Sequence, residues 1–249
     1  MMRKTALLCM ILLATAACKQ VTPEEQIAEI GTYFNQYENS FASKLSQLDE
    51  ARRTDYLTLV QAKDLGADEV WLLETDEGQA LVAEYPGRKP KKGEEPQLSL
   101  LSAPLDDPQA CASALAVIEA FRKMKIRPAS TIRTAFYSTA SDSTMVSGLT
   151  VLREDLLEAG EVVSYNLDLT TSGDEAPHTF IIEENSRFVE QFLSVLPPYF
   201  KPLGEYRFRQ GTFPNASWPI NAATYRYTLN RDELPHETAA VATLIYLLN

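Results

Sequence analysis

The chain has 249 residues, enough for one domain with a sizeable hydrophobic core. Its 34 acidic residues outnumber its 23 basic ones, which gives a formal net charge of −11 at pH 7. A surface this acidic argues against nucleic acid and anionic lipid head groups as partners.

The amino-terminal residues are typical of a targeting segment. A basic start, MMRK, precedes an apolar run, Thr5–Ala17, which is short for a membrane span and ends at Cys18. Small residues directly before a cysteine resemble a bacterial lipoprotein signal. We therefore expect residues 1–17 to be removed and Cys18 to carry lipid. The protein would then be anchored to the bacterial cell envelope, facing the periplasm or the cell surface. An ordinary cleaved signal and an anchor helix are the alternatives.

Residues 18–68 are predicted to form a helical segment. Thr22-Pro23-Glu24-Glu25 matches a capping box with proline at the first helical position, and an apolar stripe follows it. A second helical pattern spans Asp55–Leu65. The sequence leaves open whether this segment packs on the main domain or acts as a spacer.

Residues 69–249 alternate between strand and helix patterns. Glu69–Thr75 and Ala80–Tyr85 flank a short turn and predict a hairpin. Leu98–Ser102 is apolar or small throughout, which is typical of a central strand. A buried helix follows, with apolar residues recurring from Cys111 to Met124. Cys111 lies on its apolar face, where a buried hydrophobe is a better interpretation than a nucleophile.

The rest of the chain continues this alternation. Further strands are predicted at Thr131–Tyr137, Val162–Leu169 and Thr179–Ile182, and further helices at Leu149–Ala159, Arg187–Leu196 and Ala239–Leu248. Such an order predicts one α/β domain with a mostly parallel sheet and helices on both faces. With Cys9 removed with the targeting segment, only Cys18 and Cys111 remain, so no internal disulfide is expected.

Three consecutive stretches read as strand and acidic loop, buried helix, and strand and acidic loop: LSLLSAPLDD, ACASALAVIEAFRKM and RPASTIRTAFYSTASDS. This framework resembles the zinc aminopeptidases of metallopeptidase family 28, which also contains glutaminyl cyclases and inactive receptor ectodomains. The resemblance covers about residues 70–249. It implies a zinc-exopeptidase-like, three-layer α/β/α fold.

The resemblance also implies a site that this chain has only in part. An active member holds two zinc ions on a His, a shared Asp, a Glu, an Asp and a late His, and a further Glu acts as general base. Pro104 stands at the first His and Ser141 at the general base. The implied remnant ligands are Asp107 (or Asp106), Asp142, Asp168 and His236. Four such groups could hold one zinc ion at most.

Each remnant ligand also has a structural interpretation. Asp107 precedes a helix, where Asp is a common N-cap. Asp142 lies in a Ser/Thr-rich loop, where Asp is common in turns. His236 is compatible with a surface position near a helix start. Asp168 interrupts an apolar strand, where a charge needs a partner.

Three functions stay open at this point. The favoured one is a catalytically inactive, envelope-tethered domain that binds a peptide or protein, because Pro104 cannot bind metal and Ser141 cannot accept a proton near neutral pH. The second is an exopeptidase or amide hydrolase with a single metal. The third is a structural envelope lipoprotein whose amino-terminal helices mediate assembly.

Overall fold

The computed structural model describes residues 25, 67, 69–75, 78–93, 97–123, 125, 127–139, 148–171, 179–183, 207–211 and 223–248. Apart from residues 25 and 67, the helical segment predicted at residues 18–68 lies outside these residues, as do the helix predicted at Arg187–Leu196 and the residues Cys18, Ser141 and Asp142. In the described part of the chain, no helix is long and apolar enough to cross a membrane.

Strands and helices alternate along the chain. The strands are β1 (Glu69–Thr75), β2 (Gly78–Tyr85), β3 (Leu98–Pro104), β4 (Thr131–Tyr137), β5 (Val163–Thr170), β6 (Thr179–Glu183), β7 (Arg207–Gly211) and β8 (Ala223–Thr228). The helices are α4 (Pro108–Lys123), α5 (Gly148–Glu158) and α7 (Leu234–Leu248).

Among the described residues, eight strands form one sheet in the order β1-β2-β4-β3-β5-β8-β6-β7. The central strands β4, β3, β5 and β8 are parallel to one another, and so are β6 and β7. The predicted hairpin is present, since β1 pairs antiparallel with β2, while β2–β4 and β6–β8 are also antiparallel. The α/β fold with a largely parallel core is thus confirmed.

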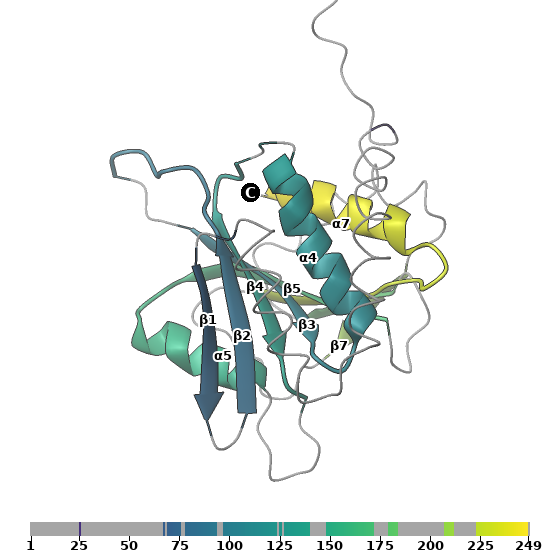
Figure 1. Ribbon diagram of the computed structural model, residues 1–249, viewed down its shortest axis with the longest axis horizontal. Coiled ribbons are helices and arrows are strands. Elements are labelled where there is room, and N and C mark those ends of the chain that lie inside the picture. The colour runs from purple at the N-terminus through teal and green to yellow at the C-terminus, as the bar shows by residue number, and fades with distance from the viewer. Residues whose placement is uncertain are drawn as a thin grey trace, which may run out of the picture.

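Helices lie on both faces of the sheet. Helices α4 and α7 pack against each other on one face, and α5 packs on the other face against β1, β2 and β4 (Figure 1). Successive residues of β3 therefore point to opposite faces of the sheet. Leu101 belongs to the hydrophobic core under α4 and α7, and Leu100 belongs to the core under α5. Every residue of β3 is buried, as expected for a central strand.

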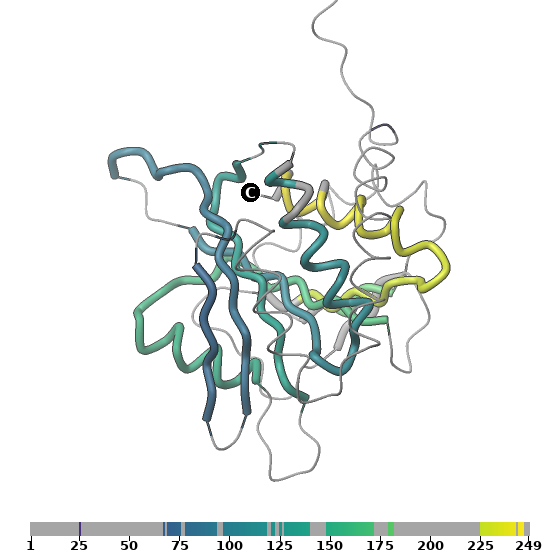
Figure 2. The backbone as a smooth tube through the Cα atoms, viewed as in Figure 1, coloured from purple at the N-terminus to yellow at the C-terminus, as the bar shows by residue number. Residues whose placement is uncertain are grey.

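A short turn connects β3 to α4 (Figure 2). The Asp107 carboxylate accepts a hydrogen bond from the Ala110 amide at 3.1 Å, which makes Asp107 the N-cap of α4. Pro108 follows at the first helical position, where the missing amide hydrogen costs nothing. This arrangement sets the start of α4 directly beside the carboxyl end of β3.

The predicted start of the last helix is wrong. Helix α7 begins at Leu234, five residues before the predicted Ala239, and so includes Pro235 and His236 in its first turn. Proline is tolerated there because the first amides of a helix have no partner within it. Strands β7 and β8 were not predicted, although β8 lies between β5 and β6 in the sheet.

Candidate functional site

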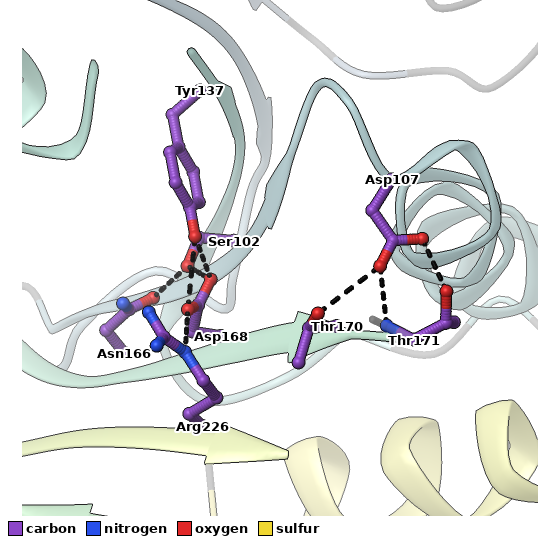
Figure 3. Close-up of polar contacts among 8 residues, drawn as sticks. All are labelled: Ser102, Asp107, Tyr137, Asn166, Asp168, Thr170, Thr171 and Arg226. Carbon is purple, nitrogen blue, oxygen red and sulfur yellow. Dashed lines mark hydrogen bonds and ion pairs between the residues drawn. The ribbon is translucent and has the colours of Figure 1, made fainter. Parts of the chain in front are cut away.

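The candidate site lies towards the carboxyl ends of the central parallel strands, where α/β proteins commonly bind ligands. In the sheet register Ser102 of β3 is opposite Asp168 of β5, and Asp168 is opposite Arg226 of β8. These residues therefore form one row across three adjacent strands. Tyr137, the last residue of β4, reaches the same point, and Figure 3 shows the four side chains meeting at the Asp168 carboxylate.

Both carboxylate oxygens of Asp168 accept hydrogen bonds. Oδ1 lies 2.9 Å from the Ser102 hydroxyl and 3.0 Å from the Tyr137 hydroxyl. Oδ2 lies 2.9 Å from Nε of Arg226 and 3.2 Å from the Tyr137 hydroxyl. The Ser102 hydroxyl is also 3.0 Å from Oδ1 of Asn166. The partner that a buried charge at Asp168 requires is therefore Arg226.

The ion pair is asymmetric in its exposure. The side chain of Asp168 is 1% exposed and that of Arg226 is 37% exposed. Burial raises the pKa of Asp168 above its ordinary value, although Arg226, Ser102 and Tyr137 act to lower it. Burial and the nearby Asp168 raise the pKa of Tyr137 well above its ordinary value, so the Tyr137 hydroxyl keeps its proton and acts as a donor.

The second carboxylate, Asp107, is engaged by β5 as well as by α4. Its Oδ2 lies 2.5 Å from the Thr171 amide and 3.3 Å from the Thr170 hydroxyl, and its Oδ1 lies 2.7 Å from the Thr171 hydroxyl (Figure 3). Asp107 is buried, and these contacts join the start of α4 to the end of β5. The N-cap interpretation of Asp107 is thus present in the structure.

The other implied ligands are placed differently. Asp106 is exposed, and its carboxylate accepts a hydrogen bond from the Thr139 hydroxyl at 3.1 Å. His236 is exposed on the first turn of α7. Asp142 lies outside the described residues. Within those residues, no three His, Cys, Asp or Glu side chains lie close enough together to hold a metal ion.

Pro104 occupies the end of β3, opposite Tyr137 of β4. Its side chain has no lone pair for a metal ion. Its carbonyl oxygen accepts hydrogen bonds from the Asp107 amide at 3.0 Å and from the Cys111 thiol at 3.1 Å. The residue therefore closes the turn into α4, and Cys111 is a buried packing residue as expected.

Two polar residues of this region were not found from the sequence. Arg226 lies in the unpredicted β8, and its only signal was a charge between Tyr225 and Tyr227 in an alternating run. Glu237 is fully buried in the first turn of α7, where its Oε2 lies 2.8 Å from the Asn230 amide. Burial raises the pKa of Glu237 to about 8, although the hydrogen bond from the Asn230 amide and the influence of the Tyr227 hydroxyl act to lower it.

A cavity of about 460 Å³ lies at the other end of the central strands. Its lining includes Leu98 and Thr131, the first residues of β3 and β4. Arg133, Glu84 and Glu161 also line it, and Arg133 forms ion pairs with both glutamates. This cavity is therefore separate from the carboxyl-end cluster around Asp168.

Comparisons with known proteins identify the fold. No protein family model matches the sequence, and no curated protein is found to match it. A Bacteroides vulgatus protein described as a Zn-dependent exopeptidase has a similar structure, with a TM-score of 0.61 and 17% identity over 87% of this chain and 95% of that one. The LapA aminopeptidase of Legionella pneumophila gives 0.56 and 16% over 94% and 72%.

A glutaminyl cyclase from Tannerella forsythia is also similar, with a TM-score of 0.52 and 14% identity over 91% of this chain and 98% of that one. Structural similarity at identities this low shows the fold alone, and the chemistry depends on the residues of each chain. The chain therefore has a zinc-exopeptidase-like, mixed α/β fold, with aminopeptidase-like proteins among its structural neighbours.

Proposed function

We propose that this chain is a catalytically inactive, aminopeptidase-like domain that is tethered to the bacterial envelope and binds a peptide or protein. The zinc-exopeptidase-like fold supports the aminopeptidase-like part of the proposal. The tether rests on the sequence around Cys18.

The observation that carries the proposal is the residue at the end of β3. Pro104 stands where the resemblance implies a metal-binding His, and a pyrrolidine ring offers no lone pair to zinc. The carbonyl oxygen of Pro104 does have lone pairs, but it accepts hydrogen bonds from the turn and from α4. Ser141, at the implied general base, adds a second loss that concerns proton transfer rather than metal binding.

The geometry of the sheet supports a binding role for the same region. Ligands of open α/β sheets bind outside the carboxyl ends of the strands. Asp106 is exposed at that edge beside Thr139, and Arg226 has a partly exposed guanidinium on β8, two strands away from β3 in the sheet. These are groups that can hydrogen-bond to the backbone or termini of a peptide without acting on it.

The test is turnover of a chromogenic amino-acid amide by the purified mature protein, with added zinc or cobalt and with a chelator control. We expect no turnover above background, for wild type or for either single change, Pro104→His or Ser141→Glu, because each restores only one of two separate requirements. Chelator-sensitive turnover that is lost in Asp168→Asn would overturn the proposal in favour of a single-metal hydrolase.

Fractionation and peptide binding test the rest. Cys18→Ala is expected to leave the membrane fraction, and retention there with unprocessed mass would contradict the tether. Fluorescence anisotropy with labelled mixed peptides is expected to show saturable binding that weakens in Asp106→Asn. A complete absence of binding would instead favour the structural lipoprotein.

A further inference from the structure

The Asp168 centre is built from three strands and closed by a residue of a fourth. Ser102, Asp168 and Arg226 occupy neighbouring register positions on β3, β5 and β8, and Tyr137 comes from β4. The hydrogen bonds that reach the carboxylate range from 2.9 to 3.2 Å. Both oxygens of the Asp168 carboxylate therefore have hydrogen-bond donors from within the chain.

A metal ion does not fit this arrangement. Zinc binds a carboxylate oxygen at about 2 Å through a lone pair, whereas both oxygens of Asp168 already accept hydrogen bonds from neutral and cationic donors. The guanidinium carries a full positive charge 2.9 Å from Oδ2, so a dication would meet a like charge at short range. Asp107, another implied co-ligand, lies between β3 and α4 and already accepts hydrogen bonds from the Ala110 amide and the Thr171 hydroxyl.

We infer that Arg226 is the resident cation of this centre, and that its guanidinium takes the place beside Asp168 that the resemblance assigns to a metal ion. The centre is thus assembled from the chain alone and does not depend on metal. This inference goes beyond the proposed function, because it concerns what holds the carboxyl ends of β5 and β8 together and is independent of any bound peptide.

Geometry explains why arginine suits this position. Asp168 and Arg226 are directly opposite on adjacent parallel strands, so the pair spans a single strand spacing of about 4.8 Å. Nε donates to the buried carboxylate, while the side chain extends far enough to remain 37% exposed. Arginine can therefore neutralise a carboxylate inside the sheet and still hydrate part of its charge.

The test combines metal binding with a double-mutant cycle. Wild type, Asp168→Asn, Arg226→Met and the double variant are compared, with Arg231→Met as the control at an exposed arginine in the loop before α7. Melting temperature is measured for each with excess zinc and with excess chelator. Zinc stoichiometry is measured by isothermal titration on wild type and on Asp168→Asn.

We expect wild type to bind no zinc at the stoichiometric level and to melt at the same temperature with zinc and with chelator. Arg226→Met should melt well below Arg231→Met, and adding Asp168→Asn to Arg226→Met should raise its melting temperature again, because no buried charge is then left unpaired. One-to-one zinc binding by wild type that Asp168→Asn abolishes would overturn the inference, and so would strictly additive effects in the cycle. The zinc titration of wild type can be interpreted even where a variant fails to fold.

Discussion

Glu237 should make the stability of this protein fall as pH rises, and Glu237→Gln should remove that effect. The side chain is fully buried, and burial raises its pKa from 4.5 to about 8. Between these two values the unfolded chain has lost the proton and the folded chain keeps it. The unfolded state then binds fewer protons, so the free energy of unfolding decreases with increasing pH in this window.

The size of the effect follows from the shift. At 1.36 kcal/mol per pKa unit, this carboxyl alone destabilises the fold by roughly 3 kcal/mol between pH 5 and pH 8. Glutamine cannot ionise, yet its side-chain oxygen can still accept the hydrogen bond from the Asn230 amide. Glu237→Gln should therefore be close to wild type at pH 5 and more stable by about 3 kcal/mol at pH 8.

The assay is urea unfolding followed by circular dichroism at several pH values, with free energies extrapolated to water. Glu158→Gln, at an exposed glutamate at the end of α5, is the matched control and should follow the wild-type curve. If the difference between Glu237→Gln and wild type stays constant from pH 5 to pH 8, the reasoning about burial at this residue is refuted.

Two further substitutions test the packing of α5 on the sheet and the ion pairs of a strand residue. A methyl group on Gly148, at the start of α5, would lie 1.9 Å from the Gln79 carbonyl oxygen. Gly148→Ala should therefore lower the free energy of unfolding by about 3 kcal/mol or more. A melting temperature equal to that of wild type would contradict this packing. Arg133 binds Glu84 at 2.8 Å and both oxygens of Glu161. Arg133→Met should lower the free energy of unfolding by about 1–3 kcal/mol, whereas the control Arg122→Met, at an exposed arginine, should change it little. Equal losses of stability in the two variants would argue against this network.

The helices and strands with simple patterns could be predicted from the sequence. Strand β3 is apolar along its whole length because both of its faces are covered, and α4 shows its apolar face because that face packs on the sheet. The hairpin of β1 and β2 followed from their local turn. These elements depend mainly on local sequence.

The rest depends on contacts between distant residues. Strand β8 carries Arg226 between two tyrosines, and this charged residue at the centre of a strand pairs with Asp168, which lies opposite on β5. A single sequence shows neither that register nor the position of β8 between β5 and β6. The early start of α7 has a similar origin, since the Glu237 carboxylate accepts a hydrogen bond from the Asn230 amide and so organises the loop before the helix.

Of the candidate site, the sequence identified two carboxylates, Asp107 and Asp168, and did not identify the side chains that surround Asp168. The need of Asp168 for a partner and the capping position of Asp107 could both be stated from the sequence, whereas the identity of the partner could not. Convergence of Asp142 with these residues stays a prediction.

We expect a guanidinium, and not a metal ion, to neutralise Asp168. A crystal structure of the purified mature protein grown with excess zinc, with anomalous data collected at the zinc edge, tests it most directly. Arg226 Nε should lie within hydrogen-bonding distance of the Asp168 carboxylate, as in the 2.9 Å contact, with no anomalous peak beside that carboxylate. A peak at about 2 Å from an Asp168 oxygen, with Arg226 turned away, would contradict it.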